Sequence, residues 1–267
     1  MREDVGDGDH TTLACIPAKA KGRARLIIKD EGILAGVQLA PLIFGAVDST
    51  LRVNILKKDG ARVKPGDVVL TVQGSARAIV TAERLVLNCM QRMSGIASKT
   101  HQLAQACMGT RARLLDTRKT TPGIRMLEKW AVLIGGGHNH RFGLFDMVLI
   151  KDNHIDYCGS ASRALASAKY YLKRKKKKLR IEVEVRNLEE LREVLREGGA
   201  HRILLDNFSP ALMKKAVSLV NGRAETEASG GINESNIRAY ALTGVDYISV
   251  GALTHSFRSL DMSLKAF

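Results

Sequence analysis

Hydrophobic and polar positions alternate in a regular way along the second half of the chain. Short apolar runs typical of buried strands are separated by longer stretches in which apolar residues recur at helical spacing. Such alternation predicts βαβ units, and so a parallel sheet with helices outside it. The predicted strands are residues 111–116, 146–151, 179–185, 201–206, 224–229 and 246–250. The predicted helices are residues 123–135, 160–172, 187–199, 209–222 and 233–244.

The ends of these predicted helices carry residues that are typical of helix starts and stops. Asn187 opens one helical stretch that closes in Gly-Gly, and Ser209 with Pro210 opens another that closes in Asn-Gly. Because one strand–helix unit repeats along the chain, the pattern favours a (β/α) barrel, complete or open. A doubly wound open sheet is the structural alternative.

The first part of the chain has a different pattern. Residues 21–40 predict a hairpin that leads into a helix, and residues 62–80 predict two strands around a Lys-Pro-Gly-Asp turn. Residues 81–98 have helical spacing of apolar positions. We therefore predict a smaller α+β sandwich domain over residues 1–90, on which the tail 256–267 packs, and a barrel domain over residues 91–255.

Composition indicates an ordinary globular protein. The 267 residues are 45% hydrophobic and 26% charged, and no apolar run approaches the roughly 20 residues of a membrane-spanning helix. The first ten residues contain no apolar signal region, so we expect a cytoplasmic protein. Four widely spaced cysteines without a Cys-x-x-Cys pair favour reduced, mostly buried thiols over a zinc or disulfide framework.

The formal charge of +15 is concentrated in one place. Residues 172–180, "LKRKKKKLR", hold seven basic side chains, and without them the charge falls to +8. The run closes an amphipathic stretch and has no interleaved aromatic residues that could stack on bases. The sequence therefore favours a solvated helix end over a nucleic-acid contact.

Candidate chemistry collects where the predicted strands end, the edge at which parallel α/β folds bind their ligands. Every strand end is polar, charged or glycine-rich. The residues in strand order are Asp116, Arg118 and Lys119; Lys151 to His154; Glu182 and Glu184; Asp206 and Asn207; Ser229 to Gly231; and Gly251 to His255.

Each of these residue types suits a different part of a ligand. Glycines beside helix starts expose backbone N–H groups that suit phosphate. Several arginines and lysines, with Arg141 brought over the mouth by the flexible loop that begins with Gly135, suit carboxylates or phosphates. Glu184 and Asp206 suit Mg²⁺ held through ligand oxygens. The sequence thus predicts a polyanionic ligand with phosphates at one end and carboxylates at the other.

For single residues, interpretations without a functional role stay open. Asp206 alone could merely cap the next helix, and a lone Ser-Gly-Gly is a weak signal. Three histidines, His138, His140 and His154, could suggest zinc, but the neighbouring arginine and lysine side chains disfavour a cation.

Taken together, the motifs resemble those of the quinolinate phosphoribosyltransferases, also called nicotinate-nucleotide pyrophosphorylases (carboxylating). The resemblance runs in order over nearly the whole chain, and its Arg-Lys-Thr and Lys-Asp-Asn-His segments are highly specific. The motifs are "EDVGDGDHTT", "RMSGIAS", "DTRKTTPGIR", "LEKWAV", "GGGHNHRFGLFDMVLIKDNHI", "IEVEV", "LLDNF", "EASGGI" and "DYISVGALTHS".

The resemblance implies a fold, a reaction and residue roles. The fold is an N-terminal α/β sandwich followed by an open-faced barrel of six to seven strands. The reaction joins quinolinate to phosphoribosyl pyrophosphate with Mg²⁺ and yields nicotinate mononucleotide, pyrophosphate and CO₂, a step of NAD biosynthesis. Carried over by motif, the residues that hold the two carboxylates are Arg118, His140, Arg141 and Lys151. Those around the phosphoribosyl group and the metal are Lys119, Glu184, Asp206, Ser229, Gly230, Gly231, Gly251 and His255.

The resemblance also implies a homodimer in which Arg84 enters the active site of the neighbouring subunit. Two other functions stay open from the residues alone. One is a related enzyme that takes another aromatic acid or acts in molybdenum-linked metabolism, and the other is a basic nucleic-acid-binding protein.

Overall fold

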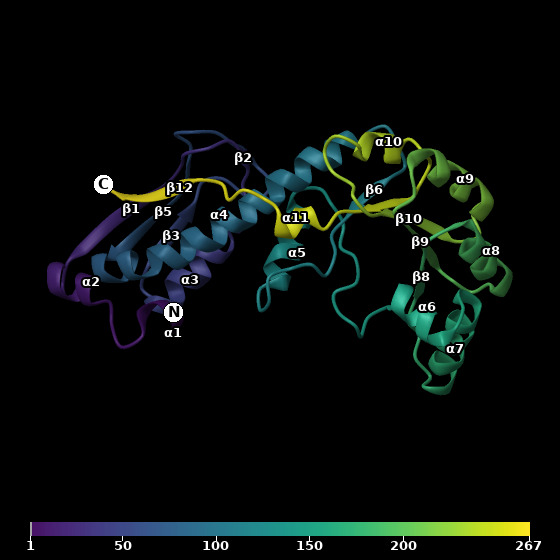
Figure 1. Ribbon diagram of the computed structural model, residues 1–267. Coiled ribbons are helices and arrows are strands. Elements are labelled where there is room, and N and C mark those ends of the chain that lie inside the picture. Colours follow the sequence, from purple (N-terminus) through teal and green to yellow (C-terminus); the bar gives the residue numbers. More distant parts are fainter. Residues whose placement is uncertain (1) are drawn as a thin grey trace. The chain divides into compact units, whose positions relative to one another are not determined.

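The structure is a computed structural model that describes residues 2–267. The chain forms two compact units. The first contains the residues up to His101 together with Gly123–Gly136 and Ser256–Phe267. The second contains Gln102–Pro122 and Gly137–His255. Figure 1 labels most of the elements of both.

The first unit is built on a four-stranded antiparallel sheet in the order β12-β1-β5-β3, with a separate two-stranded sheet of β2 and β4. Its strands are β1 (Lys21–Ile28), β2 (Gly32–Ile33), β3 (Arg52–Ile55), β4 (Arg62–Val63), β5 (Val68–Ser75) and β12 (Met262–Ala266). Its helices are α1 (Arg2–Val5), α2 (His10–Cys15), α3 (Leu39–Val47), α5 (Arg125–Ile134) and α4 (Ala76–Ala106), whose last residues pass into the second unit.

The core of the first unit follows from alternation on the strands. Ala24, Leu26 and Ile28 point to the buried face of β1, and Val86 and Met90 on α4 are buried in the same core. The tail strand β12 adds Met262 and Leu264 to it. Burial of these side chains on one face of the sheet holds the unit together.

Two sequence expectations for the first unit are wrong. Strands β1 and β2 do not form a hairpin, because β1 pairs with β5 and β12 while β2 pairs with β4. The strand expected through residue 80 ends at Ser75, where the 31-residue helix α4 begins. The hairpin does not form because both strands pair with segments far along the chain. The strand was expected to be too long because the apolar residues after Ser75 fit a strand as well as a helix.

The second unit contains six parallel strands in the order β6-β11-β10-β9-β8-β7. Within the described residues β6 and β7 form the two edges, so the barrel is open. Its strands are β6 (Arg113–Leu115), β7 (Val148–Ile150), β8 (Ile181–Val185), β9 (Arg202–Asp206), β10 (Glu225–Ser229) and β11 (Tyr247–Ser249). Its helices are α6 (Asp152–Cys158), α7 (Ala161–Arg174), α8 (Leu188–Glu197), α9 (Pro210–Val220), α10 (Ile237–Ala241) and α11 (Ala252–His255).

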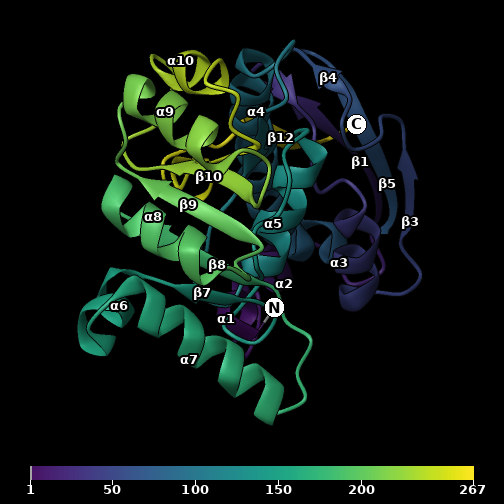
Figure 2. The ribbon, with the colours of Figure 1, turned by 90° about the vertical axis from the view of Figure 1, so that its right-hand side faces the viewer.

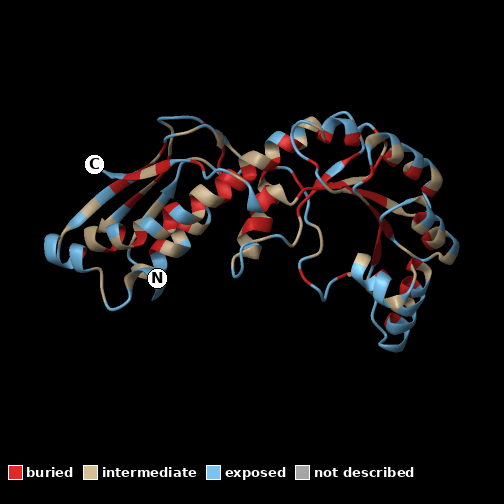
Figure 3. Cartoon of the chain, viewed as in Figure 1, coloured by how far each residue is buried: buried red, intermediate tan, exposed pale blue. Residues whose placement is uncertain are grey.

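The helices α8, α9 and α10 cover the outer face of this sheet, and its central strands β8 and β9 are almost entirely buried (Figures 2 and 3). The predicted capping is present: the Asn187 side chain accepts from the N–H groups of Glu189 and Glu190, and Ser209 Oγ accepts from the N–H of Leu212. The predicted fold class, a sandwich followed by an open parallel barrel, is confirmed.

The structure differs from the expected elements in two further respects. Helix α6 was not expected and begins directly after Lys151, where Asp152 is the first helical residue. The segment with α5, expected in the barrel domain, is grouped with the first unit, where Arg92 on α4 forms an ion pair with the buried Glu128. A contact between distant segments, which spacing along the chain does not show, places α5 there.

None of the helices in residues 2–267 has the length and hydropathy of a membrane span. All four cysteines are free thiols, but only Cys107 is fully buried and Cys15 is exposed, so the expectation of mostly buried thiols was only partly right.

Candidate active site

A cavity of 860 Å³ opens at the carboxyl ends of the barrel strands. The strand pairing explains which side chains reach it. In register, Glu184 of β8 lies beside Leu204 of β9, and Asp206 of β9 lies beside Ser229 of β10. Because neighbouring residues in parallel strands point to the same face, all four side chains line the cavity.

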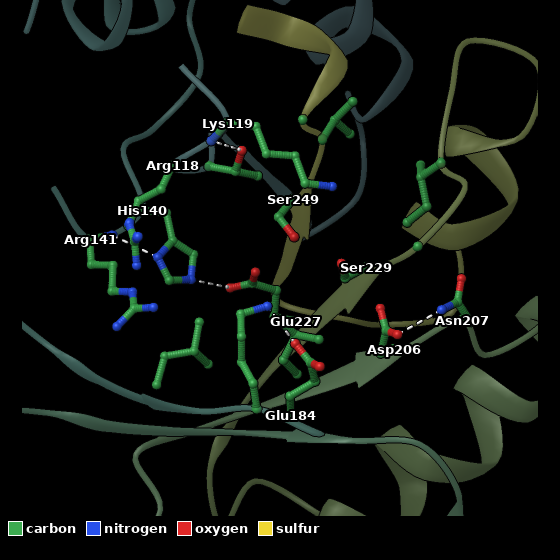
Figure 4. Close-up of a pocket in the computed structure, with 18 of the residues that line it drawn as sticks. Arg118, Lys119, His140, Arg141, Glu184, Asp206, Asn207, Glu227, Ser229 and Ser249 are labelled. Atoms are coloured by element: carbon green, nitrogen blue, oxygen red, sulfur yellow. Dashed lines mark hydrogen bonds and ion pairs between the residues drawn. The ribbon is translucent and has the colours of Figure 1, made fainter. Parts of the chain in front are cut away.

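Cationic side chains gather on one wall of the cavity. Arg118, His140 and Arg141 lie together there, opposite Asp206, Asn207 and Ser229 (Figure 4). Burial lowers the pKa of Arg141, and the neighbouring Arg118 lowers it further. Two arginines that repel each other, one of them partly desolvated, are prepared to bind an anion between them.

The loop that carries His140 and Arg141 is tied to the end of strand β6. The N–H of His138 donates to Leu114 O, and the N–H of Asp116 donates to His138 O. The fully buried Asp116 carboxylate then accepts the N–H of His140, with an Oδ1–N distance of 2.8 Å. The loop thus runs beside the sheet edge and delivers His140 and Arg141 to the cavity.

A lysine and two carboxylates line the strand ends of β7, β8 and β9. Lys151 Nζ lies 2.9 Å from Glu184 Oε2. Asp206 Oδ2 accepts a hydrogen bond from Asn207 Nδ2 at 2.6 Å. Glu184 and Asp206 come from adjacent strands and present carboxylate oxygens to the same cavity, which is the ligand type that Mg²⁺ prefers.

The opposite side of the cavity is formed by glycine-rich backbone. Gly230 has φ +93°, and a Cβ there would lie 2.2 Å from Asn207 Oδ1 and 2.8 Å from Asn207 N. Only glycine fits this turn. Gly231 and Gly251 line the cavity nearby, so backbone can approach a ligand closely, as phosphate sites of barrels require.

Below the mouth lies a buried acidic pair, Glu182 on β8 and Glu227 on β10. Both side chains are completely shielded from solvent. Burial raises the pKa of Glu182. Burial, and secondly the nearby Glu182 carboxylate, raises the pKa of Glu227 to about 7. The salt bridge between Arg202 Nη1 and Glu227 Oε2, 2.9 Å long, brings positive charge to the pair.

The structure brings together all the predicted site residues except one. Arg84 is exposed on α4 and does not line this cavity. The cavity is lined by the rest of the predicted set: Arg118, Lys119, His140, Arg141, Lys151, Glu184, Asp206, Ser229, Gly230, Gly231, Gly251 and His255.

Sequence reasoning did not single out Glu227 and Arg202. The signal was present, because Glu227 lies two residues before Ser229 and Arg202 lies four residues before Asp206, so strand alternation places each on the inward face. What the sequence did not show is that these side chains meet behind His140.

The comparisons with known proteins agree with this geometry. An open parallel barrel whose mouth sets cations against glycine-rich backbone defines a class, the barrel enzymes that act on phosphate-bearing substrates. The sequence models described as "Quinolinate phosphoribosyl transferase, N-terminal domain" and "C-terminal domain" match residues 9–94 and 96–265. The chain belongs to the quinolinate phosphoribosyltransferase family.

Individual relatives are similar over nearly the whole chain. "Quinolinate phosphoribosyltransferase [decarboxylating] 2b, mitochondrial" of Nicotiana tabacum is 48% identical over 99% of this chain and 79% of its own length. "Probable nicotinate-nucleotide pyrophosphorylase [carboxylating]" of Bacillus subtilis is 42% identical, over 98% and 89%.

Solved structures show the same fold. The crystal structure of NadC from Streptococcus pyogenes has a TM-score of 0.94 at 40% identity, over 99% of this chain and 92% of that one. The family and the activity predicted from the motifs are both confirmed.

Proposed function

We propose that this cavity transfers the phosphoribosyl group of phosphoribosyl pyrophosphate to the ring nitrogen of quinolinate. Loss of one carboxylate as CO₂ then leaves nicotinate mononucleotide, in the nicotinate-nucleotide pyrophosphorylase (carboxylating) step of NAD biosynthesis. One observation carries the assignment: a single cavity sets Arg118, Arg141 and Lys151 against the backbone of Gly230 and Gly231. That arrangement suits a substrate pair with two carboxylates at one end and phosphates at the other.

The chain's own residues contribute position and charge. The guanidinium groups of Arg118 and Arg141 hold the carboxylates of quinolinate, which orients the ring nitrogen toward the anomeric carbon. The nitrogen–carbon bond forms as the bond to pyrophosphate breaks, and Lys119 stabilises the charge on the departing group. The ring nitrogen then bears a pyridinium charge that stabilises the electron pair left on C2 as CO₂ departs, and C2 takes up a proton from water, so no side chain has to form a covalent intermediate.

The donor set at the strand ends fits Mg²⁺. Glu184 and Asp206 would hold the ion through carboxylate oxygens, directly or through water and substrate oxygens. When bound, Mg²⁺ neutralises phosphate charge and makes pyrophosphate a better leaving group. Lys151 Nζ lies 2.9 Å from Glu184 Oε2, and this ion pair holds the carboxylate at the edge of the site.

We further propose a homodimer in which Arg84 acts on the partner's cavity, as the family resemblance implies. The exposed position of Arg84 on α4 is compatible with this role. A cytoplasmic location also stays a prediction, which subcellular fractionation would test, since relatives carry the words "mitochondrial" and "chloroplastic" in their names.

Product analysis tests the proposed function directly. The protein is mixed with quinolinate, phosphoribosyl pyrophosphate and Mg²⁺, and nicotinate mononucleotide and CO₂ are measured. We expect equal amounts of the two products, and none from a Lys151→Ala variant. Absence of nicotinate mononucleotide with folded wild-type protein would refute the assignment.

A further inference from the structure

Arg186 follows strand β8 directly and does not belong to the residues that line the cavity. Its guanidinium contacts two carboxylates at once. Nη1 and Nη2 donate to the two oxygens of Asp156 at 3.1 and 2.9 Å, and Nε and Nη2 donate to Glu190 Oε1 at 2.9 and 2.6 Å. The backbone N–H of Arg186 donates to Glu190 Oε2 at 2.7 Å. Arg186 thus joins α6, which carries Asp156, to the first turn of α8, which carries Glu190.

Helix α6 is anchored by few apolar contacts. It is seven residues long, and Ile155 is the one buried side chain on it. Burial of a single side chain is a weak anchor for a helix. A bidentate contact of guanidinium with carboxylate fixes direction as well as distance, because two parallel N–H groups meet two oxygens. The contact of Arg186 with Asp156 therefore restrains α6 against the end of β8.

The start of α6 carries a residue of the candidate site. Lys151 is the N-cap of this helix, and its N–H donates to Nδ1 of His154 in the first turn at 2.9 Å. The Lys151 side chain crosses to Glu184 near the end of β8, two residues before Arg186. Strand β8 and helix α6 are therefore bridged twice, at the cavity by Lys151 with Glu184 and outside it by Asp156 with Arg186.

The two bridges differ in their exposure to a ligand. Lys151 and Glu184 both line the cavity, so a bound ligand competes for the charge that each offers the other. Arg186 and Asp156 are not among the lining residues, and a ligand in the cavity leaves their contact in place. The outer bridge can therefore hold α6 while Lys151 turns from Glu184 to a substrate.

We propose that Arg186 is a positioning residue, which holds the start of α6 through Asp156 so that Lys151 meets a carboxylate of quinolinate. The inference rests on the proposed function and deepens it, because it adds a residue outside the cavity to the binding of this substrate. Glu190 keeps the guanidinium turned toward Asp156. Partly exposed ion pairs contribute little to folding stability, so the expected effect is on substrate binding.

The two arginines that flank β8 form a matched pair for the test. Arg186 follows the strand, whereas Arg180 precedes it and forms an ion pair with Glu225 at the opposite end. Their side chains are similarly exposed, at 41% and 50%. We expect Arg186→Gln to raise the KM for quinolinate about fivefold, the size of one well-formed partly exposed pair, while kcat stays within about twofold. Arg180→Gln should stay within about twofold of wild type in both. Unchanged quinolinate KM in Arg186→Gln, or an equal change in both variants, overturns the proposal.

Asp156→Asn tests the same bridge from the side of α6 and does not depend on Arg186→Gln folding. It should raise the quinolinate KM by the same factor, and the double variant should be no worse than either single one, because both changes break one contact. Effects that multiply in the double variant would show that the two residues act separately and would overturn the bridge.

Amide hydrogen exchange measures the restraint on α6 directly. Exchange over Asp152–Cys158 should be faster in Arg186→Gln than in wild type and unchanged in Arg180→Gln, whereas equal protection in all three proteins contradicts the proposal. Wild-type protein that neither binds nor turns over quinolinate would refute the proposed function. Contrary results for these variants in an active enzyme refute only this inference.

Discussion

Replacing Arg141 by lysine keeps a positive charge in the cavity but removes the planar guanidinium. The side chain is half-buried, and burial and the neighbouring Arg118 lower its pKa, which the nearby Glu182 and Asp146 carboxylates offset only in part. Lysine would place one ammonium where the guanidinium offers two parallel N–H donors to a carboxylate.

The expected loss of activity follows from the partial shielding of the Arg141 side chain from solvent. A hydrogen bond to a charged group contributes about 1.5–3 kcal/mol. Loss of one such bond in Arg141→Lys should therefore lower kcat/KM for quinolinate by roughly 10- to 150-fold, since about 1.4 kcal/mol corresponds to a factor of ten. The change should be smaller for phosphoribosyl pyrophosphate, whose phosphates face the glycine-rich side.

Steady-state kinetics with one substrate saturating and the other varied measures this effect. Arg192→Lys, at an exposed position on α8, is the matched control and should be indistinguishable from wild type. Thermal unfolding of both variants checks that the fold is intact. Kinetics of Arg141→Lys within threefold of wild type would show that the guanidinium makes no paired contact with the substrate.

Further predictions concern specificity, backbone, protonation and assembly. Nicotinate, which has one carboxylate, should show at most about one hundredth of the quinolinate kcat/KM because a clamp charge is left unpaired, and comparable turnover would contradict this. Gly230→Ala should abolish activity, since its Cβ would meet Asn207, and wild-type turnover would disprove that clash. In the folded protein the pKa of Glu227 is raised to about 7. Its contribution to the free energy of unfolding is therefore fully present below about pH 4.5 and is lost as the pH rises through 7. Denaturant unfolding should therefore show Glu227→Gln gaining stability relative to wild type between pH 5 and 8, by up to about 3 kcal/mol, and a pH-independent difference would refute it. Co-refolding of inactive Arg84→Ala and Lys151→Ala in equal amounts should restore roughly a quarter of normal activity if the dimer exchanges Arg84, whereas no recovery in confirmed mixed dimers would exclude it.

The sequence by itself determined the class of fold and the composition of the candidate site. Alternation of apolar runs with helical stretches is a local property, and each strand–helix unit showed it independently. Because parallel strands present their carboxyl ends at one edge, Lys151, Glu184 and Asp206 could be expected at one mouth from their positions after the strands. For the barrel, the positions of these residues after their strands were enough to predict that they line one cavity.

Only the tertiary structure decided which distant segments touch. The pairing of β1 with β5 and β12 in place of a local hairpin, and the ion pair between Arg92 and Glu128, both join segments far apart along the chain. Periodicity reports which face of an element is buried and not what covers it, so these contacts left no local signal.

The buried acidic pair of Glu182 and Glu227, with Arg202 beside it, shows the same division. Alternation along β8 and β10 places Glu182 and Glu227 on the inward face, and this much was readable from the sequence. That Glu227 meets Arg202, and that both carboxylates approach the ring of His140, depends on register between neighbouring strands and on the path of the loop tied to Asp116. Such contacts are set by packing in three dimensions, so they left no local signal in the sequence.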